Sequence, residues 1–156
     1  MDSRKGKDTP DKISAPLILS QVCRDWRATA LSTSRLWSSI KLDFDLYRDT
    51  MACQYLLQMY LQRSAMHDIV LSLHSKREIS RSHLIPVLLL SAPRWTSVSR
   101  SISYRSLHTF SAARGTLHRL KRLSVMFIGD APVLPQPDFF AELPKPIFDA
   151  CYEYVR

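Results

Sequence analysis

The sequence predicts an α/β protein in which strands and helices alternate along the chain. Four segments have the apolar alternation or the β-favouring residues of strands, with centres near Leu42, Leu71, Val98 and Leu123. These centres are 29, 27 and 25 residues apart, and apolar residues at helical spacing lie between them. A strand followed by a helix at a nearly constant interval is typical of a solenoid, whose successive units stack to bury a shared core.

Size and composition set limits on this fold. A chain of 156 residues, 46% of them hydrophobic, can form one compact domain together with a small helical module. The longest apolar run, 84–90, contains Pro86 and is far shorter than the ~20 residues that span a bilayer, so we expect no membrane segment. Three widely spaced cysteines and an N-terminus without a signal peptide predict an intracellular protein, cytoplasmic or nuclear, with reduced thiols in its core.

The N-terminal third is predicted to contain a polar tail and two helices. Residues 1–14 have too little apolar surface to fold and are expected to be disordered. From Pro16 the apolar residues fall at spacings of three and four, which predicts one amphipathic helix with the stripe Leu19, Val22, Cys23, Trp26 and Ala30. Ser32 and Thr33 are expected to cap a shorter helix that contains Leu36 and Trp37.

The next segments alternate in type. Residues 40–44 predict a half-buried strand, and residues 48–64, which lack Pro and Gly, predict the longest helix. One side of that helix is expected to carry Tyr55, Leu56, Met59, Tyr60 and Arg63. Residues 67–75 predict a strand with Ile69, Leu71 and Leu73 on one face.

Proline and glycine divide the remainder of the chain. A helix beginning at Ser80 or Ser82 is expected to run to Leu90, delayed or kinked by Pro86 and closed by Pro93. A strand over 95–103, a short helix over 107–115 and a strand over 120–127 follow. Five prolines predict a surface loop over 129–146, and residues 147–155 are expected to form a final helix or strand.

Residues 16–40, and above all the string VCRDWRATALSTSRLWSSI at 22–40, resemble the second half of an F-box as it occurs in fungal F-box-like proteins with a leucine-rich-repeat-like region. An F-box is a compact three-helix unit. The resemblance implies docking on the Skp adaptor of an SCF ubiquitin ligase and recruitment of a target protein by the repeats. It divides the chain into a tail (1–14), partial F-box-like helices (15–40) and a truncated leucine-rich-repeat-like region (41–156).

The resemblance also assigns a binding surface. Adaptor contact is expected from the apolar anchors Leu19, Val22, Cys23, Trp26, Leu31, Leu36 and Trp37. The other interpretation of the two tryptophans is that they pack on each other and on the first repeat. The family's opening helix, "LPxEIL", would fall at 6–14, where nothing resembles it, so we expect a chain truncated at both ends relative to the family pattern.

Two alternative functions follow from the same observations. Without the opening helix, the chain would be a truncated or diverged interaction module that does not bind the adaptor. Residues 76–129 carry ten basic side chains and one acidic one, which suggests nucleic-acid binding through a basic face over 76–122. That face would comprise Arg94, Arg100, Arg105, Arg114, Arg119, Lys121 and Arg122, but no reader motif accompanies the charge.

No catalytic pattern accompanies these interaction signals. The five histidines do not have the spacing of metal ligands, and three glycines in the whole chain do not form a phosphate-binding loop. Asp43 and Asp45 flank a strand end and are interpreted as solubilising residues. The sequence therefore predicts a protein that is not an enzyme and uses neither a cofactor nor a metal.

Overall fold

The computed structural model describes residues 14–46 and 51–128. Its helices are Ser14–Val22 (α1), Arg24–Ser32 (α2), Met51–Arg63 (α3) and Leu84–Leu89 (α4). Its strands are Ser39–Asp43 (β1), Ile69–His74 (β2), Trp95–Ser103 (β3) and Arg122–Ile128 (β4). Three 3₁₀ helices complete the described part: Ser34–Trp37 (η1), Ala92–Arg94 (η2) and Tyr104–Ala113 (η3).

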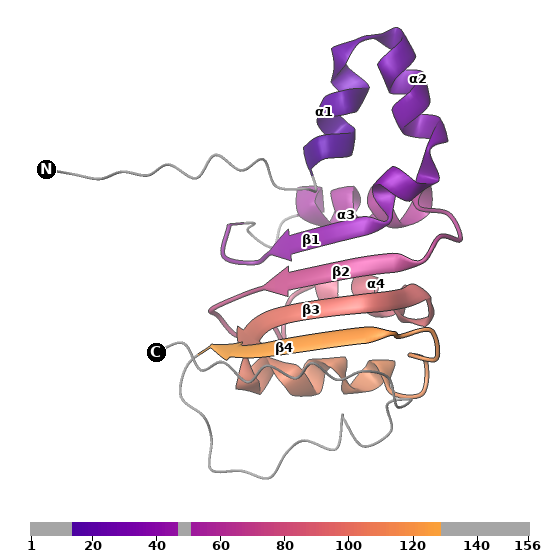
Figure 1. Cartoon of the computed structure of the whole chain (residues 1–156). Coiled ribbons are helices and arrows are strands. Elements are labelled where there is room, and N and C mark those ends of the chain that lie inside the picture. Colours follow the sequence, from indigo (N-terminus) through magenta and orange to yellow (C-terminus); the bar gives the residue numbers. More distant parts are fainter. Residues whose placement is uncertain (1–13, 47–50, 129–156) are drawn as a thin grey trace, which may run out of the picture.

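The strands form one parallel sheet in the order β1-β2-β3-β4, so each strand pairs with its neighbours in the sequence. Helices α3 and α4 lie on one face of this sheet, behind the strands in Figure 1. The predicted mixed α/β class is confirmed, and so are the four predicted strands. Within the described residues, no helix combines the length and the apolar character that a membrane crossing requires.

Apolar side chains from the strands form the core against the helices. Ile40, Leu71, Val98 and Leu123 are partners in the sheet register and are all buried. Leu71, Val98 and Leu123, three of the four predicted strand centres, thus lie side by side. The fourth predicted centre, Leu42, lies two residues after Ile40, the residue that pairs with Leu71. Because side chains alternate with a period of two, that shift leaves Leu42 on the correct face.

Helices α1 and α2 form a hairpin that projects beside β1 (Figure 1). The prediction of one continuous helix is wrong, because the backbone at Cys23 is extended (φ −155°, ψ 177°) and separates α1 from α2. Arg27 Nε donates a hydrogen bond to the Ser20 carbonyl across this break (2.7 Å). The Cys23 thiol is exposed, which corrects its expected place in the core.

The predicted capping of the next helix is right in position only. Thr33 is the N-cap residue of η1 but forms no side-chain cap bond there. The hydroxyls of Ser32 and Thr33 instead donate back to the Thr29 carbonyl (3.1 and 2.7 Å) at the end of α2.

Helix α3 is present, and Tyr60 on its predicted side is buried. Tyr55 on that side is exposed, however, and Leu57 outside it is buried.

Proline and glycine act on the later helices largely as expected. Helix α4 begins at Leu84 with Pro86 in its first turn, and the Ser82 hydroxyl accepts the Leu84 N–H (3.2 Å). The segment after β3 is a 3₁₀ helix, η3, which ends before Gly115 at φ +77°. The predicted proline-rich loop (129–146) and final element (147–155) lie outside the described residues, and so does the predicted tail (1–14) apart from Ser14, which begins α1.

Candidate functional site

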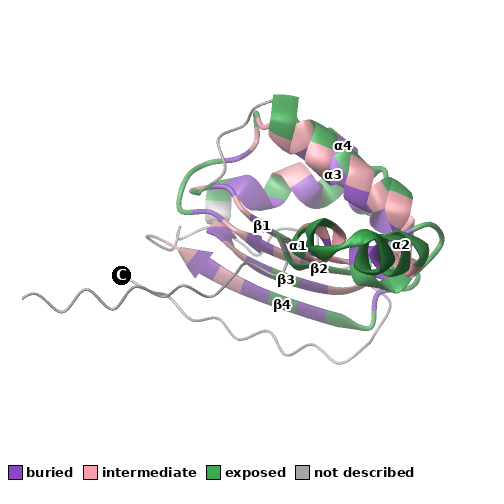
Figure 2. Cartoon of the chain, turned by 90° about the horizontal axis from the view of Figure 1, so that it is seen from above, coloured by how far each residue is buried: buried purple, intermediate pink, exposed green. Residues whose placement is uncertain are grey.

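The α1–α2 hairpin exposes most of its apolar side chains. Val22 is 58% exposed and Trp26 53% exposed, and Ile18 is similarly accessible. Among the hairpin residues whose burial is described, only Pro16 and Ala30 are buried, which Figure 2 shows as a largely exposed pair of helices. Such a patch on a hairpin with almost no core of its own is typical of an interaction site.

The predicted adaptor-binding residues divide into two groups. Val22, Cys23, Trp26, Leu31 and Leu36 are exposed, and Leu19 is half-buried, so a partner can reach all six. We call Ile18 together with these six residues the hairpin patch.

Trp37 is a core residue, which corrects its predicted role in docking. Its indole is 0% exposed, and its Nε1–H donates to the Ala30 carbonyl (2.8 Å). The Tyr60 ring meets it edge-on with 5.0 Å between centroids, and the Arg63 guanidinium lies 4.5 Å from its centroid. The indole therefore joins α2 to α3 and attaches the hairpin to the body of the protein.

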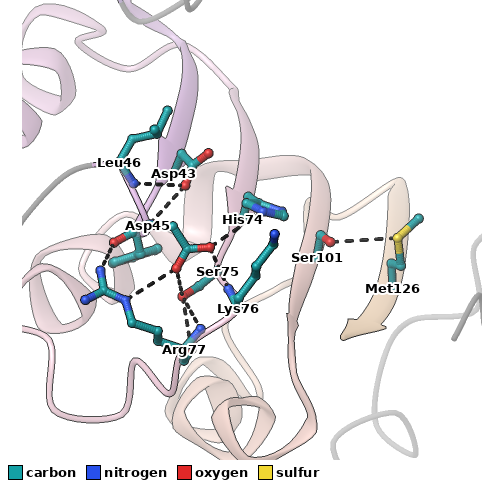
Figure 3. A network of polar contacts seen from close by, with 10 residues as sticks. Asp43, Asp45, Leu46, His74, Ser75, Lys76, Arg77, Ser101 and Met126 are labelled. Carbon is teal, nitrogen blue, oxygen red and sulfur yellow. Dashed lines mark hydrogen bonds and ion pairs between the residues drawn. The ribbon is translucent and has the colours of Figure 1, made fainter. Parts of the chain in front are cut away.

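Polar side chains connect the ends of β1 and β2 (Figure 3). The Asp43 carboxylate accepts the backbone N–H groups of Asp45 and Leu46 (2.9 and 3.3 Å), which fixes the turn after β1. Asp45 in turn accepts the Lys76 backbone N–H (2.8 Å) and pairs with Arg77 Nε (3.4 Å). Asp43 fixes the turn after β1 and Asp45 joins that turn to the loop after β2, so neither carboxylate is simply solubilising.

The same network shifts the ionisation of Asp45. Partial burial raises the pKa of this carboxyl, but the hydrogen bonds from Lys76 and Arg77 and the charges of His74 and Arg77 together lower it below its ordinary value of 3.8. Possible ligand atoms of Asp43, Asp45 and His74 come within 4.8 Å of one another. Arg77 Nε lies 3.4 Å from Asp45 and the Lys76 N–H donates to it, so the cluster ties the loops after β1 and β2 together.

The predicted basic face is not one surface. Arg100 points into the core, where it is 1% exposed and its guanidinium lies 4.1 Å from the centroid of Phe110. This burial lowers the pKa of Arg100. Arg105 follows the end of β3, whereas Arg122 begins β4, so the two lie at opposite ends of parallel strands.

Other members of the predicted basic face have structural partners. Arg94 donates to the His67 carbonyl through Nε and Nη2 (3.1 and 2.9 Å), and Arg119 pairs with Asp68 (3.0 Å). Lys121 and Arg114 are exposed on separate segments. The basic side chains therefore do not form a single groove for a phosphate backbone.

Within the described residues, the other broad surface is the sheet face opposite α3 and α4, which we call the open face. It carries many serines, including Ser97, Ser99 and Ser101 on β3. Sequence reasoning did not single these residues out, although serine at every second position of a predicted strand places the hydroxyls on one face.

No family model, curated protein or solved structure matches this chain. The features of the structure that bear on function are the hairpin patch, its attachment through Trp37 and the open face of the sheet.

Proposed function

We propose that this chain is an F-box-like receptor that recruits a target protein to an SCF-type ubiquitin ligase. The hairpin patch docks on the Skp adaptor, and the sheet with its helices is the start of a leucine-rich-repeat-like solenoid that contacts the target. The protein works by binding partners and does no chemistry itself.

The exposed apolar side chains of the hairpin are the observation that carries this proposal. Trp26 and Val22 expose more than half of their surface to water, although large apolar residues are normally buried. Burial of such side chains in a partner's groove removes them from water, and buried tryptophans are frequent energetic centres of interfaces. The resemblance at 16–40 supports the Skp adaptor as that partner.

The sheet supports the second half of the proposal. Its four strands are parallel and follow sequence order, with the helices that connect them on one face, so each strand–helix unit contacts its neighbours in the chain. This is the arrangement expected of solenoid units, and it leaves an extended open face.

A binding assay with the purified adaptor tests the proposal. The full chain is expected to co-purify with Skp at low salt, and Trp26→Ala is expected to weaken the complex by about 2 kcal/mol, roughly 30-fold. Leu90→Ala is the matched control, because Leu90 is 84% exposed but lies at the end of α4, outside the hairpin. It should leave binding unchanged.

Two results would contradict the proposal. Absence of any complex between the folded wild-type chain and Skp would favour an interaction module that does not bind the adaptor. Equal losses in Trp26→Ala and Leu90→Ala would show that association is not centred on the hairpin. Circular dichroism of each variant establishes that the fold is intact.

A further inference from the structure

Basic side chains accompany the exposed apolar side chains of the hairpin. Helix α1 contains no charged residue, and residues 14–38, which comprise the hairpin and η1, carry Arg24, Arg27 and Arg35 against one carboxylate, Asp25. All four of these side chains are exposed. Three positive charges and one negative charge give this region a charge of +2, beside the hairpin patch.

The two arginines of α2 lie in one row with an apolar residue of the patch. Arg24, Arg27 and Leu31 follow one another at spacings of three and four, so they are neighbours on one side of the helix. At 3.6 residues per turn, Asp25 is about 160° around the helix from Arg27. It lies in the first turn, where a carboxylate interacts favourably with the helix dipole. The carboxylate of α2 therefore has a structural role and leaves the row positive.

The Arg27 guanidinium is held in place within the hairpin. Its Nε–H donates to the carbonyl of Ser20 (2.7 Å), which lies in the last turn of α1, where carbonyls lack an intrahelical partner. Within the described residues, its two terminal nitrogens form no hydrogen bond or ion pair. Two such nitrogens can donate parallel bonds to one carboxylate. Because the side chain is already ordered, it loses little conformational freedom when it binds one.

The other two arginines are available as well. In the part of the chain that the structure describes, the side chains of Arg24 and Arg35 form no ion pair or hydrogen bond. An apolar centre with a polar rim is the usual anatomy of an interface. A partner that covers Trp26 and Val22 brings its own rim close to these cations, where basic side chains would repel and carboxylates would attract. The charges therefore select a partner with an acidic rim.

An anionic membrane is the other surface that exposed apolar and basic side chains can meet. Basic segments that recognise anionic lipids carry clusters of about four to eight lysines and arginines. The described hairpin and η1 carry three. This smaller number favours a protein groove, in which apolar contacts supply most of the affinity and a few charges determine the partner.

We propose that the groove that receives the hairpin patch is bordered by carboxylates, that Arg27 forms the ordered contact with one of them, and that Arg24 attracts the others. This inference rests on the proposed function in taking that groove to belong to the Skp adaptor. It adds a basis for selectivity, because an apolar groove with a basic rim is rejected.

Rate measurements by surface plasmon resonance test the inference, with the full chain and the purified Skp adaptor. The association rate of the wild type is expected to fall at least about tenfold between about 50 and 500 mM salt, because salt screens the attraction between exposed charges. Arg24→Glu should lower the association rate at low salt about tenfold and remove most of its salt dependence, because it reverses one charge of the rim.

Two changes at Arg27 separate charge from geometry. Arg27→Gln is expected to weaken the complex about tenfold, mainly through faster dissociation. Arg27→Lys keeps the charge but lacks the planar guanidinium, so the salt dependence should persist while dissociation stays faster than in the wild type. Hydrogen exchange of α1 and α2 reports any loosening that follows loss of the bond to Ser20. Arg24→Glu has no such bond to lose, so its result is independent of this effect.

Arg105→Gln is the matched control, because Arg105 is an exposed arginine in η3, outside the hairpin. It should change both rates less than about twofold, since charges separated by more than about 10 Å are screened at 0.1 M salt. Equal losses in Arg24→Glu and Arg105→Gln would indicate unspecific attraction to a basic protein and would overturn the inference.

The remaining outcomes separate this inference from the proposed function. A Skp complex whose rates respond neither to salt nor to Arg24→Glu would overturn the acidic rim and leave adaptor docking intact. Absence of any Skp complex would overturn both. Binding to phosphatidylserine vesicles that is tighter than binding to Skp, and that is lost in Arg24→Glu, would assign the arginines to a membrane surface and overturn the inference.

Discussion

Replacement of Trp37 is expected to destabilise the protein severely, although the same motif contains a tryptophan that can be removed with little cost. The Trp37 indole is fully buried, contacts Tyr60 and donates a hydrogen bond to the Ala30 carbonyl. Truncation of a buried tryptophan to alanine costs about 3–5 kcal/mol through lost burial and the cavity left behind. That is a large share of the ~5–15 kcal/mol by which domains are stable.

A smaller change separates packing from hydrogen bonding. Trp37→Phe keeps an aromatic ring against Tyr60 but removes the Nε1–H that joins η1 to α2. The lost bond and the smaller ring together should cost about 1–3 kcal/mol. Urea unfolding followed by circular dichroism measures both changes. At a slope of ~2 kcal/mol per molar urea, Trp37→Ala should lower the midpoint by about 2 M.

Trp26→Ala is the matched control for this measurement. Because Trp26 is half exposed and its indole forms no hydrogen bond within the described residues, its removal should cost less than about 1 kcal/mol. A loss of stability in Trp26→Ala equal to that in Trp37→Ala would refute the reasoning, since it would mean that the hairpin patch is already buried in the isolated protein.

Three further changes probe local features. Ala65→Gly should raise stability by about 0.5–1 kcal/mol in urea unfolding, because Ala65 has a left-handed backbone (φ 48°) that glycine adopts without strain; a loss would contradict this. Asp45 has a lowered pKa when folded, so its stabilisation is complete above about pH 4 and is lost as the pH falls through the folded pKa. Asp45→Asn should therefore weaken the pH dependence of the free energy of unfolding between about pH 5 and 3. If this pH dependence is the same in the variant and the wild type, the tie between Asp45 and Arg77 is contradicted. Arg94→Lys should cost about 1–2 kcal/mol in the same assay, because an ammonium cannot reproduce the two guanidinium bonds to His67; a neutral result would show that they are dispensable.

The strands were predictable because each has a strong local signal. In 69–74 Ile69, Leu71 and Leu73 fall at every second position, and β2 has this predicted face buried. The spacing between strand centres also indicated which residues would be neighbours, and Leu71, Val98 and Leu123 are partners in the register. A period-two pattern combined with a regular interval therefore carried most of the information about the sheet.

The hairpin was not predictable in the same way. Helical spacing continues across Cys23, so the pattern alone gave no sign that the backbone becomes extended there. Nor did the sequence distinguish Trp26 from Trp37, since both are tryptophans in one helical motif. Their difference arises from tertiary contacts with α3, in particular with Tyr60, which lies more than twenty residues further along the chain.

Those tertiary contacts also attach the hairpin to the body of the protein. The hairpin has almost no buried core of its own, and it is held by Leu17, which packs against the core, and by the Trp37 indole, which links α2 through Tyr60 to α3. A change at Trp37 can therefore alter the orientation of the hairpin patch relative to the sheet while leaving every residue of the patch unchanged. Trp37→Phe is expected to increase hydrogen exchange in α1 and α2 while the exchange of β2 and β3 stays slow, whereas uniform protection in both regions would show that the hairpin is held by something other than the indole.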